Sequence, residues 1–167
     1  MSDARNVLSA TVFSVAMIAC AGAAVSACIT PRERQAYEVY ALRTEILVGA
    51  QSCRMTERFN VFATKFTREL TAEGRELRAH YLKTYGKGGD KALDDFVTRI
   101  ANASFVEGSG GGDLCAATTA LFDEIMALPE GQLAAYTSQH TPPALPAMEV
   151  CGQPKIKVAK ATKQQLP

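Results

Sequence analysis

The chain has 167 residues, of which 47% are hydrophobic, and a formal net charge of +1. That length is typical of one domain, and the apolar fraction excludes a chain that is disordered throughout. The small net charge gives no sign of the basic surface that nucleic acids require, so no nucleic-acid partner is expected.

The first predicted element is an export signal over residues 1–27. Its uncharged run from Val7 to Ala27 follows Arg5 and ends in the small residues Ala23, Ala24, Ser26 and Ala27. A basic start, an apolar middle and small residues at the end are typical of a secretory signal peptide. At about 21 residues the run is also long enough to span a bilayer if it stays uncleaved. We therefore expect a periplasmic or secreted protein.

Cys28, directly after this segment, leaves two alternatives open. The sequence Val25-Ser26-Ala27-Cys28 fits a lipobox, in which the cysteine becomes the lipid-bearing first residue of an envelope lipoprotein. The same residues suit ordinary signal peptidase, which leaves the thiol of Cys28 unmodified and able to form a disulfide. Membrane association is expected only if Cys28 is lipidated or the signal segment is retained.

Residues 28–140 are predicted to form the helical domain. Helical periodicity indicates a first helix over about 32–52 and a second, longer helix that bends near Glu73 and Gly74, because glycine costs ~1 kcal/mol inside a helix. Asp90 is expected to cap the third helix and Asp113 the fourth, which ends before Pro129. A short fifth helix follows. Each of the first four helices has a set of inward-facing positions. In chain order these sets are Val39, Leu42, Ile46, Ala50 and Cys53 in the first helix; Phe59, Phe62, Phe66, Leu70, Leu77, Tyr81 and Tyr85 in the second; Leu93, Phe96, Val97, Ile100 and Ala101 in the third; and Leu114, Cys115, Leu121, Phe122, Ile125 and Leu128 in the fourth.

Residues 141–167 are predicted to be a flexible, disordered tail that is rich in proline and basic. Its lysines, which an anionic envelope surface or an envelope protein would attract, are Lys155, Lys157, Lys160 and Lys163. The fold class expected from the whole pattern is all-α: an antiparallel bundle of four to five helices between a signal segment and this tail.

The helix order of an up-and-down bundle predicts how the cysteines pair. Cys53 and Cys115 fall at one end of the bundle, and Cys28 and Cys151 fall at the other. A disulfide requires Cα atoms about 4.4–6.8 Å apart, whereas a helix of about 20 residues is about 30 Å long, which argues against Cys28–Cys53. The pairs Cys53–Cys115 and Cys28–Cys151 are therefore favoured. Lipidation of Cys28 would leave Cys151 unpaired, and Cys53 is alternatively a small buried apolar residue.

No catalytic, cofactor-binding or metal-binding residues are predicted. The two histidines are far apart in the sequence, and adjacent acids on a helix point about 100° apart, so neither set converges on one site. The glycine-rich loop lacks the Gly-Lys-Ser/Thr of a phosphate-binding loop, and Ser109 lacks the glycine pattern of a nucleophile elbow. The residues so considered are His80, His140, Asp94, Asp95, Asp123 and Glu124. They are interpreted as surface residues.

Four segments in this order, LRTEILVGAQSC, RFNVFATKF, LDDFVTRIANAS and LFDEIM, resemble a group of small exported proteobacterial helical proteins that is uncharacterised. The resemblance covers about residues 36–128 and implies export and an all-helical domain, with no site residues. The expected function is a non-enzymatic binding or structural module of the bacterial cell envelope. The alternatives are a lipoprotein that serves as an accessory subunit of an envelope assembly, and an enzyme of unrecognised type.

Overall fold

The structure, a computed structural model, describes residues 28–109 and 113–152. The helices are α1 (Pro31–Ser52), α2 (Thr56–Lys65), α3 (Thr67–Tyr85), α4 (Gly89–Ser109), α5 (Leu114–Ala127) and α6 (Leu133–Gln139), with a 3₁₀ turn η1 (Gly86–Gly88) between α3 and α4. The predicted all-α class is confirmed for these residues. In the same ranges, no helix has the length and apolar character needed to cross a membrane. The expected signal segment lies outside the described residues.

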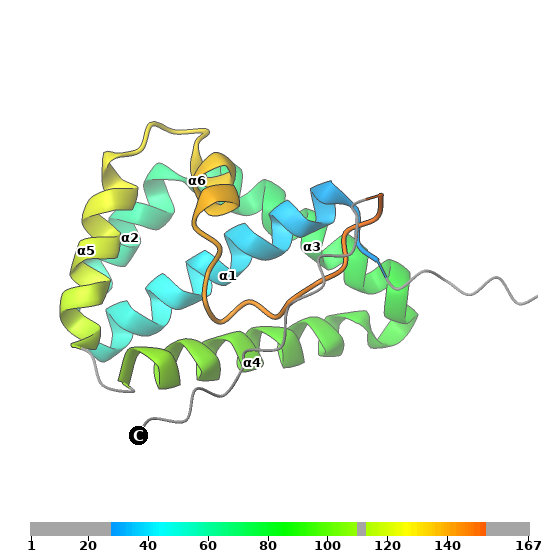
Figure 1. Cartoon of the computed structure of the whole chain (residues 1–167), viewed down its shortest axis with the longest axis horizontal. Coiled ribbons are helices and arrows are strands. Elements are labelled where there is room, and N and C mark those ends of the chain that lie inside the picture. Colours follow the sequence, from blue (N-terminus) through cyan, green and yellow to red (C-terminus); the bar gives the residue numbers. More distant parts are fainter. Residues whose placement is uncertain (1–27, 110–112, 153–167) are drawn as a thin grey trace, which may run out of the picture.

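Helix α1 is the central helix of the bundle and packs against every other α-helix (Figure 1). The predicted stripe, Val39, Leu42, Ile46 and Ala50, is buried against α2, α5 and α6. A second face of α1, which the periodicity did not indicate, is also buried and includes Ala36, Tyr37 and Ala41. Because α1 is enclosed on both faces, a single amphipathic stripe describes only half of its packing.

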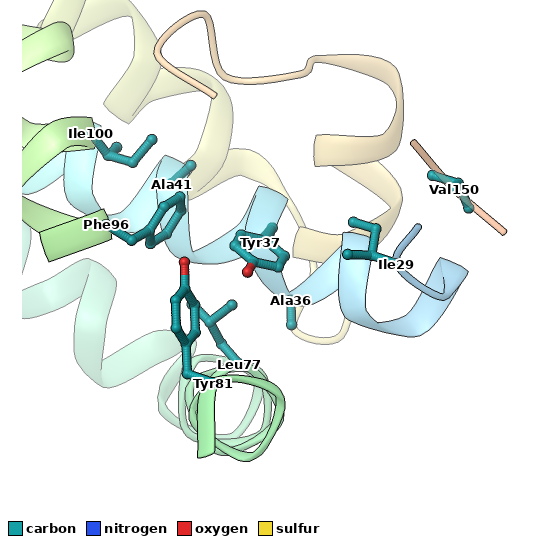
Figure 2. Close-up of a cluster of buried hydrophobic side chains, with 9 residues drawn as sticks. All are labelled: Ile29, Ala36, Tyr37, Ala41, Leu77, Tyr81, Phe96, Ile100 and Val150. Carbon is teal, nitrogen blue, oxygen red and sulfur yellow. The ribbon is translucent and has the colours of Figure 1, made fainter. Parts of the chain in front are cut away.

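The two faces of α1 divide the core into two clusters. Figure 2 shows the first cluster, in which the ring of Tyr37 meets the ring of Phe96 edge-on at a centroid distance of 5.0 Å. The second cluster holds Phe62, Phe66 and Phe122, all fully or almost fully buried. Burying an aromatic side chain of this kind contributes about 1.5–3 kcal/mol, so both clusters stabilise the position of α1.

A complete capping box begins α1. The Thr30 hydroxyl accepts a hydrogen bond from the Glu33 amide at 3.1 Å, and the Glu33 carboxylate accepts one from the Thr30 amide at 2.7 Å. Pro31 occupies the first turn, where its missing N–H costs nothing. These local bonds satisfy backbone donors that a helix start otherwise leaves unpaired.

The expected bend in the second helix is wrong in position. The chain breaks at Phe66, between α2 and α3, and α3 continues through Glu73 and Gly74. The side chain of Glu73 accepts hydrogen bonds from Arg32 and Gln35 of α1, which holds α3 against α1 at that point. The break at Phe66 still leaves the Phe66 side chain buried in the second cluster.

The predicted N-cap residue is confirmed at the start of α5 and is wrong at the start of α4. The Asp113 carboxylate accepts hydrogen bonds from the amides of Cys115 and Ala116 at 3.0 and 3.1 Å, which confirms the predicted cap. Helix α5 ends before Pro129, as expected. Asp90, in contrast, lies inside the first turn of α4, where its carboxylate accepts two hydrogen bonds from Arg78. With Asp90 as the cap the helix would begin at Lys91, so α4 begins two residues earlier than predicted.

Residues 141–152, which we call the arm, were expected to belong to the disordered tail. In the structure the arm leads from α6 across α1 to the start of α1 (orange in Figure 1). There the Ile29 amide donates to the Glu149 carbonyl and the Cys151 amide donates to the Ile29 carbonyl, both at 2.8 Å. These bonds and the buried side chain of Val150 order the arm. Residues 153–167, with the four lysines, lie outside the described residues.

Candidate functional site

The four described cysteines form two disulfides at opposite ends of α1. Cys53 is joined to Cys115 with a Cα–Cα distance of 5.4 Å, and Cys28 is joined to Cys151 with a distance of 5.1 Å. These are the pairs favoured from the helix order. The arm supplies the return path to the first end of the bundle, because α6 alone does not reach it.

The polar residues considered in the sequence lie at separate places. His80 contacts Glu33, His140 ends α6, Asp95 pairs with Lys91, and Asp123 pairs with Arg58. Within residues 28–109 and 113–152, no three His, Cys, Asp or Glu side chains are grouped as a metal ion would require. Glu124 lies beside a cavity.

That cavity is open to solvent on one side, has a volume of about 370 Å³ and is lined by residues of α1, α4, α5 and the arm. We call it the α1–α5 pocket. Its walls combine apolar surface with a few polar groups, and its lining residues are Glu45, Val48, Gly49, Ser104, Leu114, Ala117, Thr118, Ala120, Leu121, Glu124 and Pro143. Apolar walls with a small number of polar groups are the usual construction of a small-molecule site.

The contact between α1 and α5 depends on Gly49. A Cβ atom at this position would overlap the side chain of Thr118, so only glycine allows the two helices to lie this close. Thr118 is buried, and its hydroxyl donates to the Leu114 carbonyl at 2.7 Å. Together these two residues form a rigid part of the pocket wall.

Ser104 of α4 is the unusual polar residue of this pocket. Its side chain is 6% exposed, and its hydroxyl oxygen finds no hydrogen-bond partner among the residues that the structure describes. A buried hydroxyl without a partner costs about 1–3 kcal/mol, and such groups in a pocket wall are typical contacts for a ligand or an ordered water.

Two carboxylates give the pocket a negative character. The Tyr136 hydroxyl donates to the Glu124 carboxylate at 2.9 Å. Burial, this hydrogen bond, and the charges of Glu124 and Glu45 raise the pKa of Tyr136 to about 12. Glu45 and Glu124 are the charged side chains among the described lining residues, and both are acidic.

A second cavity, of about 260 Å³, lies where α2 meets α3, and two of its charged side chains, Lys65 and Glu69, bind backbone groups of neighbouring elements. Lys65 donates to the Met126 carbonyl at 2.7 Å. The Glu69 carboxylate accepts hydrogen bonds from the amides of Gly131 and Leu133, at the start of α6. The α1–α5 pocket is therefore the better candidate site.

Sequence reasoning assigned none of these residues to a site: Leu114 and Leu121 were expected to face the core, and Glu124 was interpreted as a surface residue. Glu45, Ser104 and Glu124 come from three helices, and no spacing in the chain relates them. Gly49 in the middle of a helical stripe was the available signal, because an internal glycine often marks a close helix contact. The chain matches no protein-family model, no curated protein and no solved structure.

Proposed function

We propose that the chain is a small exported protein of the bacterial cell envelope that acts as a non-enzymatic binding module. The observation that carries this proposal is the pair of disulfides, which uses all four described cysteines. Disulfides persist in oxidising compartments such as the periplasm and are rare in the bacterial cytosol. The uncharged run from Val7 to Ala27, with its small terminal residues, supplies a matching export signal.

The α1–α5 pocket supports binding as the activity. Recognition of a small molecule needs a shaped apolar cavity and a few fixed polar groups. The Gly49–Thr118 contact fixes the wall of this cavity, and Ser104 and Glu124 supply polar groups.

The disulfide of Cys28 favours an exported protein with an unlipidated Cys28 over the lipoprotein alternative. A bacterial lipoprotein would carry its diacylglyceryl group on the Cys28 sulfur, which is the atom bonded to Cys151. The two modifications exclude each other on one molecule. The oxidised chain with an unmodified Cys28 is therefore the form that we propose.

The mass and fractionation of the native protein test this proposal. We expect an N-terminus at or near Cys28, a free α-amino group, no free thiols, and release with the periplasmic or secreted fraction. An intact Met1 on a reduced protein in the cytosolic fraction would overturn export. A diacylglyceryl mass on Cys28, with partitioning into a detergent phase, would replace the proposal by the envelope lipoprotein.

A further inference from the structure

We infer that the α1–α5 pocket binds a small organic cation. Its ammonium group lies at Glu45 and Glu124, its apolar body fills the pocket, and a polar group at its far end meets Ser104. This inference rests on the proposed function, because it takes the chain to be a binding module. It goes further by assigning a site and the chemical class of the ligand.

The size of the pocket sets the size of the ligand. A volume of about 370 Å³ is within the range of about 300–1,000 Å³ that small-molecule sites occupy. Val48, Leu114 and Leu121 line it with apolar surface from α1 and α5. An aromatic ring with a short side chain fits this space, whereas a peptide helix does not.

The charge of the pocket sets the charge of the ligand. Glu45 comes from α1 and Glu124 from α5, so two helices present carboxylates to one cavity. Burial raises the pKa of Tyr136 to about 12, and the hydrogen bond to Glu124 and the charges of Glu124 and Glu45 add to that rise. The α4 and arm residues of the wall, Ser104 and Pro143, add no charge. A ligand anion would be repelled here, and an ammonium group would be attracted.

Burial separates the two polar regions of the pocket. Glu124 is exposed and Glu45 is half-buried, whereas Ser104 is nearly enclosed. The carboxylates therefore lie nearer to solvent, and the unpartnered hydroxyl lies deeper. A purely apolar ligand would leave the Ser104 hydroxyl unsatisfied, which is unfavourable for a buried polar group. A ligand with a hydroxyl or carbonyl group at its inner end would satisfy it.

Three probes of one shape and different charge test the cation preference. Phenethylammonium, 2-phenylethanol and 3-phenylpropanoate are titrated into the mature chain with its disulfides intact, and binding is followed by calorimetry and amide NMR shifts. We expect saturable binding of the cation at least about fivefold tighter than that of the alcohol, which corresponds to an ion pair of about 1 kcal/mol. The anion should bind most weakly. Equal affinities for cation and alcohol, or no saturable binding of the cation, would overturn the inference.

Matched variants locate the binding. Glu45→Gln and Glu124→Gln should each weaken phenethylammonium binding, whereas Asp94→Asn, which removes the same charge from an exposed position of α4, should leave it unchanged. Ala120→Trp places a large ring at the exposed edge of the pocket and should abolish binding without disturbing the core. Equal losses in Asp94→Asn and Glu124→Gln, in folded variants, would show a non-specific charge effect and overturn the site.

Tyramine tests the role of Ser104, because it adds one hydroxyl at the far end of phenethylammonium. Wild type should bind tyramine several-fold tighter, and Ser104→Ala should remove that difference. This variant deletes a hydroxyl that has no partner in the described residues, so it should fold. A tyramine preference that survives in Ser104→Ala would overturn the assigned contact.

The outcomes separate this inference from the proposed function. A cytosolic, reduced native protein whose refolded, oxidised chain still binds phenethylammonium would refute export and leave the pocket assignment standing. An exported, oxidised protein that binds none of the three probes would refute the pocket assignment and leave export standing.

Discussion

His80 of α3 lies against Glu33 in the first turn of α1, with 2.9 Å between the histidine Nδ1 and a carboxylate oxygen. Beside them, Arg32 donates to both carboxylate oxygens of Glu73 at 2.7 and 2.6 Å. A histidine–carboxylate contact and an arginine–carboxylate ion pair thus connect the start of α1 to α3. Both contacts involve the first turn of α1, which directly follows Cys28, so they lie at the same end of the bundle as the Cys28–Cys151 disulfide.

The Glu33 contact predicts a loss of stability in acid. The hydrogen bond with His80 and the bond from the Thr30 amide lower the pKa of Glu33 from 4.5 to about 2. A lowered pKa in the folded state adds stability above pH 4.5, and this contribution falls away as the pH drops toward 2. The His80 and Glu33 side chains are only 15% and 13% exposed, so solvent screens the pair in part and we expect about 1–2 kcal/mol.

Urea unfolding at pH 6 and pH 3 measures this effect. Glu33→Gln keeps a hydrogen-bonding side chain in the capping box and removes the titrating group. The free energy of unfolding of the variant should therefore fall less between the two pH values than that of wild type. Identical falls in both proteins would show that Glu33 does not contribute.

The second core cluster predicts large losses from truncating its phenylalanines. Phe62 is 0% exposed and Phe66 is 1% exposed. Phe62→Ala and Phe66→Ala should each lower the free energy of unfolding by about 3–5 kcal/mol. Val61, in the same helix as Phe62, is 57% exposed. Val61→Ala should therefore change the free energy of unfolding by only about 0.5 kcal/mol. Denaturant unfolding with intact disulfides measures the stability of the three variants. If both phenylalanine variants unfold at the same denaturant concentration as wild type, the core assignment is contradicted.

The disulfide pairs predict a simple peptide map. Digestion without reducing agent should release one fragment that joins Cys53 to Cys115 and another that joins Cys28 to Cys151. The Cys53–Cys115 bond closes a sequence separation of 62 residues, so Cys53→Ser with Cys115→Ser should cost about 4 kcal/mol. A Cys28–Cys53 fragment would contradict the fold, because α1 separates these residues along its whole length.

The close approach of α1 and α5 predicts an energetic coupling. Gly49→Ala places a methyl group where the Thr118 side chain lies, so it should destabilise the protein by about 1–3 kcal/mol. Thr118→Ala removes the overlapping hydroxyl and methyl groups and should offset part of that loss. In a double-mutant cycle we expect a coupling of about 1 kcal/mol. Strict additivity of the two changes would mean that the helices move apart freely.

The sequence was sufficient for features that depend on neighbouring residues or on chain order. The ranges of α1 and α5 follow from apolar spacing, and Asp113 caps α5 as its position suggests. The cysteine pairs follow from which helix ends lie at the same end of the bundle. The second buried face of α1 was missed because Ala36 and Ala41 give a weak apolar signal beside the stripe.

Features that depend on distant contacts could not be predicted in this way. The glycine at position 74 suggested a bend, but the contacts of Glu73 with α1 keep α3 continuous there. The arm was expected to be disordered because prolines exclude regular structure, yet its order comes from hydrogen bonds to Ile29. The α1–α5 pocket combines side chains of three helices and the arm, so no local pattern indicates it.

The joining of Cys28 to Cys151 has a mechanical consequence. A pulling force applied to the chain before Cys28 and after Cys151 would pass through the single sulfur–sulfur bond, so the helices between them would carry no tension. With that bond reduced, the same force would act first on the backbone pairing of Ile29 with Val150 and would peel the arm from the bundle. Pro143, which lines the pocket, would leave with it. The oxidised molecule is thus protected against stretching at the point where Cys28 and Cys151 meet.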